Sequence, residues 1–467
     1  MRKNFKHMSL ALALMGPVAF VGCGGGGSDT ESDPELTAPE LPGGEDSDGG
    51  TGSPTSPSPS NASFRILAMG DSGTEECAAL DSRVAIHDAS RNLDRVLSPA
   101  ANGDVSIGEL ASGDTVTIFD ENDSTVRAVT ITESRLPPTI EWTVSNYQGT
   151  QGDCYTLDQD EGPEFEAVVT NAAGFDSVEL GPDAKFLRSS GQSSDRAILM
   201  AEDEYRVFAG GYAGAEGESA RLTDYGLTDL GTPAEGSTVD IEASTAATPY
   251  AVSLPSTVVS IGASWIDPDT GYPYELESIN VNDTNRDQLN SLNVIEPSVG
   301  ELAVRHVHFG DPSAGQAQVN IVEILDNVDT ISLSNADLSA LTNVNRSGRE
   351  ISYQFTDSAG EGERIQDVRA TLFGFGFGGE KTFSHTLISD SVEPVVVLPD
   401  LSSLIQSPTA DITTARVEVT IAANSPLVQD FIFGSSGFFG VSNIDEGLGT
   451  DILTGEFRTY YNSFLQN

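Results

Sequence analysis

Apolar side chains alternate with polar ones along much of this chain, and this period of two constrains the fold more than any other feature. It is clearest between residues 83 and 144, where runs such as Val105-Ser106-Ile107 and Val116-Thr117-Ile118 are separated by glycines. Successive side chains of a strand point to opposite faces, so this pattern is typical of half-buried antiparallel strands. The sequence predicts an all-β fold of tandem antiparallel β-sandwich domains after a disordered tether.

Helical patterns are few and short. The segments predicted as short helices are Asn92–Leu97, Arg286–Leu292 and Asn335–Leu341. Strands and helices do not alternate along the chain, which argues against a parallel α/β sheet.

The N-terminal residues hold a basic start, an apolar run and a cysteine. Three basic residues precede the apolar residues 8–20, and Gly22 stands directly before Cys23. The run is shorter than the roughly 20 residues that cross a bilayer. This arrangement resembles a bacterial lipoprotein signal peptide. The resemblance implies removal of residues 1–22, lipidation of Cys23, and attachment to the membrane through that lipid, at the outer membrane or cell surface of a Gram-negative bacterium.

Residues 23–62 are predicted to be a disordered acidic tether rich in Gly, Ser and Pro. From residue 24 to 62 there are eight acidic residues and no basic one. Such a composition buries too little apolar surface to offset chain entropy. The rest of the chain is predicted to divide into a β-sandwich at 63–162, a β domain at 163–297, and a third β segment at 298–467 that is long enough for two domains.

The charge balance is strongly acidic. The chain has 71 acidic and 23 basic residues, a formal net charge of −48. Binding to a phosphate backbone needs a basic surface, so a nucleic-acid partner is not expected.

Residues 83–118 resemble the carboxypeptidase-regulatory-like and transthyretin-like β-sandwich modules. Asn102-Gly103-Asp104 and Gly113-Asp114 match the turns of their pattern, and Leu110 matches an inward-facing residue. Residues 302–324 resemble a family of bacterial surface sandwich domains of unknown function. The first resemblance implies a scaffold, a spacer or a binding surface, and it carries no catalytic residues.

Two further cysteines remain once Cys23 is assigned to lipid. In the oxidising compartment that a lipoprotein signal implies, Cys77 and Cys154 are predicted to form a disulfide, with two free thiols as the alternative. The loop that it closes would contribute about 4 kcal/mol in the chain-entropy model.

Gly70-Asp71-Ser72 resembles the nucleophile block of esterases that carry Gly-Asp-Ser. That family needs an acidic residue three positions before its histidine, and no such pair exists in this chain. The residues three before His87, His306, His308 and His385 are Val84, Ala303, Arg305 and Thr382. We therefore expect Ser72 to lie in a turn, and we predict no catalytic residue.

His306 and His308 are the histidine pair best placed to share a metal ion, because alternate residues of a strand lie on one face. Asp311 or His385 could supply a third ligand of the kind that zinc or copper uses. The alternative interpretation is two histidines on a solvated face.

Asp283, Asn285 and Asp287 alternate as calcium ligands do in a loop. Gln288 replaces the glycine of the calcium-loop pattern, and Val294 replaces its closing acid. We expect no cofactor, with calcium as the one candidate.

These observations predict a lipid-anchored cell-envelope protein with a structural or binding role, not an enzyme, whose partner is a protein or carbohydrate at the cell surface. The alternatives are a secreted hydrolase of polysaccharide or ester, and a carbohydrate-binding protein. The last would need exposed aromatic platforms, and the chain has two tryptophans, Trp142 and Trp265.

Overall fold

The computed structural model describes residues 63–69, 75–121, 124–136, 139–144, 149–156, 164–181, 185–188, 194–200, 206–214, 220–229, 231, 233–268, 273–282, 285–287, 289–295, 301–310, 317–325, 330–357, 363–375, 381–405, 411–423 and 457–465. Within these ranges the regular structure consists of β-strands and two single-turn 3₁₀ helices, Glu133–Arg135 and Ala172–Gly174. The prediction of an all-β fold built from β-sandwiches is confirmed.

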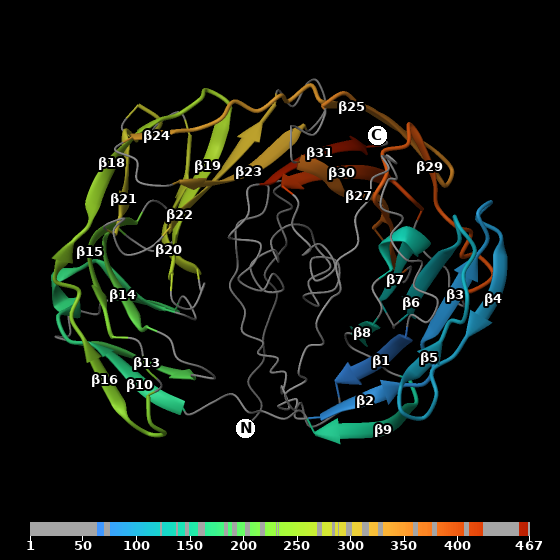
Figure 1. Cartoon of the computed structure of the whole chain (residues 1–467), viewed down its shortest axis with the longest axis horizontal. Coiled ribbons are helices and arrows are strands. Elements are labelled where there is room, and N and C mark those ends of the chain that lie inside the picture. Colours follow the sequence, from blue (N-terminus) through green and yellow to red (C-terminus); the bar gives the residue numbers. More distant parts are fainter. Residues whose placement is uncertain are drawn as a thin grey trace, which may run out of the picture.

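A twelve-stranded sheet runs from one side of an arch to the other (Figure 1). All neighbouring strands in it are antiparallel except β28 (Thr382–Ser389) and β7 (Thr125–Thr132), which are parallel and join the two halves of the chain. Its strands, in spatial order, are β20 (Pro273–Asn280), β19 (Val258–Ile266), β22 (Glu301–Phe309), β23 (Gln318–Leu325), β31 (Phe457–Leu465), β30 (Thr414–Ala423), β27 (Glu363–Gly374), β28 (Thr382–Ser389), β7 (Thr125–Thr132), β6 (Thr115–Glu121), β3 (Arg83–His87) and β4 (Leu93–Leu97).

Smaller sheets pack against this one or against each other. The first contains β5 (Asp104–Ser106), β1 (Ser63–Met69), β2 (Glu75–Ala79), β9 (Gln151–Thr156) and β8 (Thr139–Val144). Two more contain β13 (Asp195–Met200), β10 (Glu164–Val169) and β16 (Thr238–Ile241), and β12 (Lys185–Arg188), β11 (Ser177–Gly181), β14 (Phe208–Ala213), β15 (Arg221–Leu227) and β17 (Thr245–Ala246). The last two contain β21 (Ser291–Val294), β18 (Thr248–Ser253) and β24 (Thr330–Ser332), and β25 (Leu341–Ser347), β26 (Glu350–Phe355) and β29 (Val395–Val397).

Strands β3, β6 and β7 are buried on both faces, unlike the half-buried strands that the sequence predicts. On one face, Val84 and Ile86 pack in a core with the sheet that contains β1. On the other, Ala85 and Ala128 join a second core that spans residues 319–460. The alternation of apolar and polar residues marks only the first of these faces. The second is covered by chain more than 200 residues away, which no local pattern reveals.

The three predicted helices are wrong. Residues 93–97 form strand β4, residues 285–287 form a turn before β21, and residues 338–340 form a turn before β25. Each segment contributes to strand pairing or to a turn between strands, which overrides its weak local helical preference.

The turns at Gly103 and Gly113 lie where the sequence predicts them. Both glycines have positive φ values, 85° and 88°. A Cβ atom at Gly103 would also come within 3.0 Å of the Ile66 carbonyl oxygen. Leu110 is half-buried and packs against the core, as predicted.

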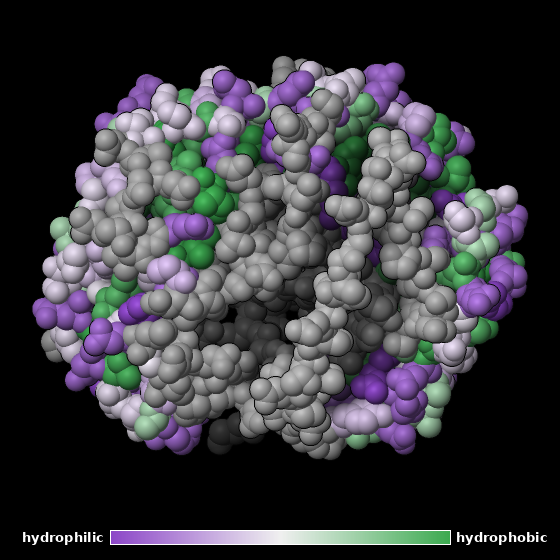
Figure 2. Space-filling model, in the orientation of Figure 1, coloured by the Kyte–Doolittle hydropathy of each residue, from purple (hydrophilic) through white to green (hydrophobic). Residues whose placement is uncertain are grey.

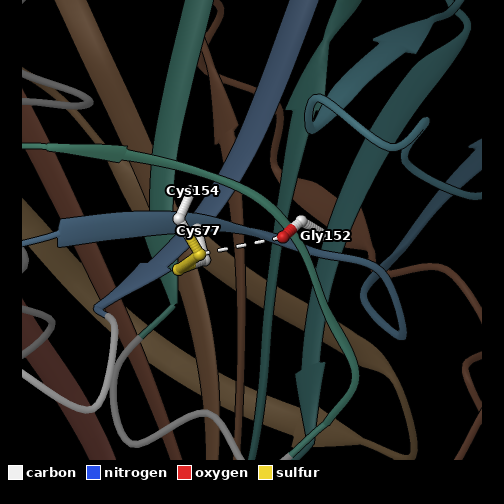
Figure 3. The surroundings of a disulfide bond; sticks show 3 residues. All are labelled: Cys77, Gly152 and Cys154. Atoms are coloured by element: carbon white, nitrogen blue, oxygen red, sulfur yellow. Dashed lines mark hydrogen bonds between the residues drawn. A yellow bond between two sulfur atoms is a disulfide. The ribbon is translucent and has the colours of Figure 1, made fainter.

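The predicted disulfide between Cys77 and Cys154 is confirmed (Figure 3). The two cysteines lie opposite one another on the paired strands β2 and β9. The Sγ atom of Cys154 lies 3.7 Å from the Gly152 carbonyl oxygen. This is a van der Waals contact and not a hydrogen bond, because a disulfide sulfur has no proton to donate. At Gly152 a Cβ atom would lie 2.4 Å from the Ala101 carbonyl oxygen, so the chain passes here only without a side chain.

Hydrophilic side chains cover much of the outer rim of the arch on the face shown in Figure 2. Among the described residues, no helix is long and apolar enough to cross a membrane.

Candidate functional site

A cavity of about 350 Å³ lies beside strands β27 and β28 of the large sheet, under the segment that follows β29. This volume is within the range of sites for small molecules. Its apolar lining residues are Leu372, Phe383, Pro399, Leu401, Ile405 and Ile412, and its polar lining residues are Arg349, His385, Asp400 and Ser402.

Strand pairing places the buried part of this lining. Leu372 of β27 lies opposite His385 of β28, and Phe383 is two residues before His385 on the same face. All three side chains are at least nine-tenths buried. Leu401 is buried as well, in a turn closed by the hydrogen bond from the Leu404 N–H to its carbonyl oxygen. The cavity thus has a rigid floor on two long neighbouring strands.

His385 is the end of a row of buried polar side chains that crosses the sheet from β28 to β3. Its Nε2 atom lies 2.8 Å from the Thr130 hydroxyl, which lies 2.7 Å from the Thr117 hydroxyl. The Thr117 hydroxyl lies 3.3 Å from Nδ1 of His87. We call His87, Thr117, Thr130 and His385 the open row, because no described residue bonds either outer ring nitrogen, Nδ1 of His385 or Nε2 of His87.

Both imidazoles of the open row are neutral at physiological pH. Burial, followed by the charges of nearby His87 and Arg349, lowers the pKa of His385 to about 3. Burial and the neighbouring Arg91 lower the pKa of His87 to about 4. A neutral imidazole has one donor and one acceptor nitrogen, so the nitrogen of each ring that points into the row can be either the donor or the acceptor.

The open row therefore has two polarities of hydrogen bonding. If the Thr130 hydroxyl donates to His385, the Thr117 hydroxyl donates to Thr130 and His87 donates from Nδ1. Nδ1 of His385 then carries a proton, and Nε2 of His87 accepts. Reversing every hydrogen bond makes Nδ1 of His385 an acceptor instead. A ligand in the cavity can accordingly find either a donor or an acceptor at His385.

The mouth of the cavity carries one cation and one anion. One guanidinium nitrogen of Arg349 donates to the Leu398 carbonyl oxygen at 2.6 Å, which orients the head group. Asp400 accepts from the Ser402 backbone N–H at 2.9 Å. The backbone and side chain of Ser402, with a further effect from Arg349, hold the pKa of Asp400 below its usual value. Within the described chain neither residue makes an ion pair closer than 4 Å.

His306 and His308, the predicted candidate metal pair, are fully buried, so their predicted alternative place on a solvated face is wrong. Nδ1 of His306 lies 2.8 Å from Nε2 of His308, whose Nδ1 lies 2.8 Å from the Thr257 hydroxyl. Nε2 of His306 lies 3.3 Å from the Glu323 carboxylate. We call these four residues the closed row, because a partner stands at both ends.

The polarity of the closed row is set by Glu323. Burial alone would raise the pKa of Glu323, but hydrogen bonds from His306 and Ser334 outweigh it and lower that pKa. A carboxylate only accepts, so Nε2 of His306 carries a proton. An imidazole whose one proton is on Nε2 accepts at Nδ1, so His308 donates to His306 from Nε2, and Thr257 donates to Nδ1 of His308. Burial and His306 lower the pKa of His308 to about 4, which keeps that ring neutral.

The closed row uses the ring nitrogens that a shared metal ion would need. His385, one suggested third ligand, is five strands away in the large sheet, about 24 Å at the usual strand spacing. Asp311, the other, lies outside the described residues. Among the residues that the structure describes, no three His, Cys, Asp or Glu side chains are grouped to hold a metal ion.

The candidate calcium loop is described only in part. The amide of Asn285 is used within its own turn, accepting from the Asn282 N–H at 2.8 Å and donating to the Asn280 carbonyl oxygen at 2.7 Å. Asp287 is exposed, and Asp283 lies outside the described residues. Calcium binding here stays a prediction.

Cys23 and Ser72 also lie outside the described residues, so lipidation and the absence of a catalytic serine stay predictions. Trp265 lies in a core with Tyr274, and Trp142 packs against another. Trp265 is fully buried and Trp142 is half-buried, so neither is the exposed aromatic platform that the carbohydrate-binding alternative needs.

The open row and the cavity are the features that the sequence analysis missed. Thr130 and His385 are 255 residues apart, and the parallel pairing of β7 with β28 brings them together. The local signal was present in Thr115, Thr117 and Thr130, small polar residues on the face that solvent was expected to cover. Comparison with protein-family models and with curated proteins finds no match to this chain.

Proposed function

We propose that this chain is a binding protein of the cell envelope, held at the outer membrane or cell surface by lipid on Cys23, with its ligand site in the cavity beside His385. The observation that carries this proposal is the meeting of a guanidinium, a carboxylate and a neutral imidazole in one cavity with apolar walls. Pockets with few convergent polar groups among apolar side chains are typical of small-molecule sites.

The large sheet supports the scaffold part of this role. Hydrogen-bonded strands run without a break from β20 to β4, so the sandwiches on either side of the cavity share one backbone network. A site on such strands is held more rigidly than a site on loops. The tether predicted at residues 23–62 would hold this arch away from the membrane surface.

The protonation of His385 favours binding over hydrolysis. A general base is most effective when its pKa lies near the working pH. With a pKa of about 3, His385 holds a proton too weakly to act as a base at neutral pH. Its ring can still donate or accept a hydrogen bond, which is what recognition of a ligand needs.

The proposal is tested by NMR of histidine side chains in the mature chain, purified in detergent and labelled with ¹⁵N-histidine. Fractions of low-molecular-weight cell extract are added, and signals are assigned with single histidine variants. We expect at least one fraction to shift the ring signals of His385 and His87 and to leave those of His306 and His308 in place. If every fraction leaves His385 unmoved, the cavity is not a binding site.

The anchor is tested separately. Changing Cys23 to Ala should move the protein from the membrane fraction to the soluble fraction of the cell, because the resemblance makes this cysteine the lipid attachment point. Retention in the membrane fraction would place the anchor elsewhere. It would not contradict the ligand site, which the NMR experiment tests independently.

A further inference from the structure

We propose that the cavity beside His385 binds a free α-amino acid with an apolar side chain, its carboxylate held by Arg349 and its ammonium group held by Asp400. This inference rests on the proposed function, because it names the ligand class of the same cavity.

The two charged side chains at the cavity mouth are not paired with each other. Arg349 and Asp400 line the same cavity, yet neither forms an ion pair with the other or with any other described residue. Each is oriented by a backbone contact instead, Arg349 through Leu398 and Asp400 through Ser402. Arginine binds carboxylates in a planar geometry that suits an α-carboxylate. A ligand with a cation next to an anion completes both groups at once.

The rest of the cavity lining suits an apolar side chain. Behind the charged mouth the lining is apolar, and Leu372, Phe383 and Leu401 are buried. An aliphatic or aromatic side chain placed there removes apolar surface from water. A charged or long polar side chain would lose its hydrogen bonds with water there, and the apolar lining would not replace them.

The electrostatic field of the whole protein favours a ligand without net charge. A formal net charge of −48 opposes the approach of an anion and attracts cations without selectivity. A zwitterion has no net charge, so this field neither repels nor enriches it. A simple carboxylic acid would have to overcome the field with Arg349 alone, and a simple amine would leave Arg349 without a partner.

The open row lets the floor of the site adapt to the ligand. Nδ1 of His385 is a donor in one polarity of the row and an acceptor in the other. If a ligand carboxylate accepts from His385, every hydrogen bond of the row takes the direction in which Nε2 of His87 is an acceptor. Binding at the cavity is thereby read out at His87, three hydrogen bonds away.

The inference is tested by calorimetric titration of the mature chain with three ligands of one shape. L-Leucine carries both charges, 4-methylpentanoate lacks the ammonium group, and 3-methylbutylamine lacks the carboxylate. We expect L-leucine to bind at least tenfold more tightly than either analogue, since one charge-assisted hydrogen bond is worth roughly that factor.

Variants assign the two charges. Arg349→Gln should weaken L-leucine at least tenfold and leave 3-methylbutylamine unchanged, while Asp400→Asn should weaken L-leucine and leave 4-methylpentanoate no weaker. Arg349→Lys should keep part of the affinity. The matched controls are Arg196→Gln, an exposed arginine on another sheet, and Asp337→Asn, which accepts from the Ser339 N–H at 2.9 Å just as Asp400 does from Ser402. Both controls should bind L-leucine normally.

Three outcomes would overturn the inference. If 4-methylpentanoate binds as tightly as L-leucine, the ligand is a carboxylate and Asp400 has no role. If no apolar amino acid binds although an extract fraction shifts His385, the ligand class is wrong and the proposed function stands. If neither amino acids nor extract fractions act on His385, both proposals fail.

Discussion

The open row and the closed row are built from the same kinds of side chain in the same sheet, yet they end differently. The closed row runs from the Thr257 hydroxyl to the Glu323 carboxylate, and every ring nitrogen in it has a partner. The open row ends in two ring nitrogens that no described residue bonds, one of them at the lining of a cavity. Burial alone therefore does not fix the direction of the hydrogen bonds in a row of imidazoles. A terminal group that can only accept, such as a carboxylate, is what selects one polarity.

This difference separates a structural role from a responsive one. A polar network in which every member is satisfied stabilises a unique arrangement, whereas one with a free end is costly unless something completes it. The closed row therefore has the properties expected of a structural hydrogen-bond network that links the start of β19 to β22 and β23. The open row has what is expected of a site that waits for a ligand.

The largest expected effect is on the dependence of stability on pH. The histidines ordinarily have a pKa near 6.5, but in the folded chain the pKa is about 4 for His87 and His308 and about 3 for His385. Below pH 6.5 the unfolded chain therefore binds protons that the folded chain does not, and the free energy of unfolding falls as pH decreases towards 4. Each ring should contribute on the order of 1 kcal/mol per pH unit after allowance for solvent screening.

This pH effect compares the rows directly, because two lowered pKa values lie in the open row and one in the closed row. The double variant His87→Leu, His385→Leu should flatten the pH dependence about twice as much as His308→Leu does. Urea unfolding at several pH values between 4.5 and 7.5 measures it, and subtracting the wild-type curve removes the carboxylate contribution. Equal flattening by the two variants would mean that the rows are protonated alike.

The next effect is on stability at pH 7.5, where these lowered pKa values keep the rings neutral. Changing His306 to Leu leaves the Glu323 carboxylate and the Nε2 proton of His308 without partners, and should cost about 3 kcal/mol. Changing His87 to Leu removes a 3.3 Å hydrogen bond together with a nitrogen that already lacked a partner, and should cost about 1 kcal/mol or less. Chemical unfolding of both variants measures this. A cost at His87 as large as that at His306 would show that the open row is as complete as the closed one.

The contrast between the rows also shows how far sequence reasoning reaches. The period of two predicts the strands, and the spacing of His306 and His308 correctly places them on one face, because both inferences depend only on neighbouring residues. The disulfide was predictable because Cys77 and Cys154 were the pair left after Cys23. The burial of that shared face was not predictable, because the same face of β22 packs in a core with β21 and β24 of another sheet, which no local pattern reveals.

The cavity is even harder to predict from the sequence. Arg349, Phe383 and Asp400 belong to a turn, a strand and a loop that no local pattern relates, and only the stacking of the sheet with β25, β26 and β29 on the large sheet brings them together. His87 illustrates the same limit, because its face of β3 is covered by a core whose other members begin at residue 126. Alternation tells which residues share a face, but not how many layers cover it.

A smaller effect is expected from removing single hydroxyl groups. Thr130→Val keeps the side-chain shape, leaves the buried Nε2 of His385 without a partner, and leaves the Thr117 hydroxyl with only its 3.3 Å contact to His87, which should cost about 2 kcal/mol. Thr257→Val removes the end of the closed row at a half-buried position, where water can replace the hydroxyl, and should cost about 0.5 kcal/mol. Unfolding midpoints of the two variants measure this. The reverse order would mean that water reaches the open row.

The smallest effect, and the most direct test of the comparison, is the position of single protons. In the closed row the Glu323 carboxylate holds a proton on Nε2 of His306, and His308 should likewise carry its proton on Nε2. The ring ¹⁵N chemical shifts of His308 should therefore be those of one pure tautomer. In the ligand-free open row both polarities are available, so His385 and His87 should show shifts averaged between tautomers, and always in the same sense, since both rings are protonated at Nδ1 in one polarity and at Nε2 in the other. A ligand whose carboxylate accepts from His385 should drive His385 to the Nδ1-protonated form and His87 to the form that is protonated at Nδ1 and accepts at Nε2. The variant Thr130→Val cuts the row in the middle, so the ligand should then move His385 alone. If His87 still follows His385 in that variant, the two rings communicate by another route and the open row is not the connection between them.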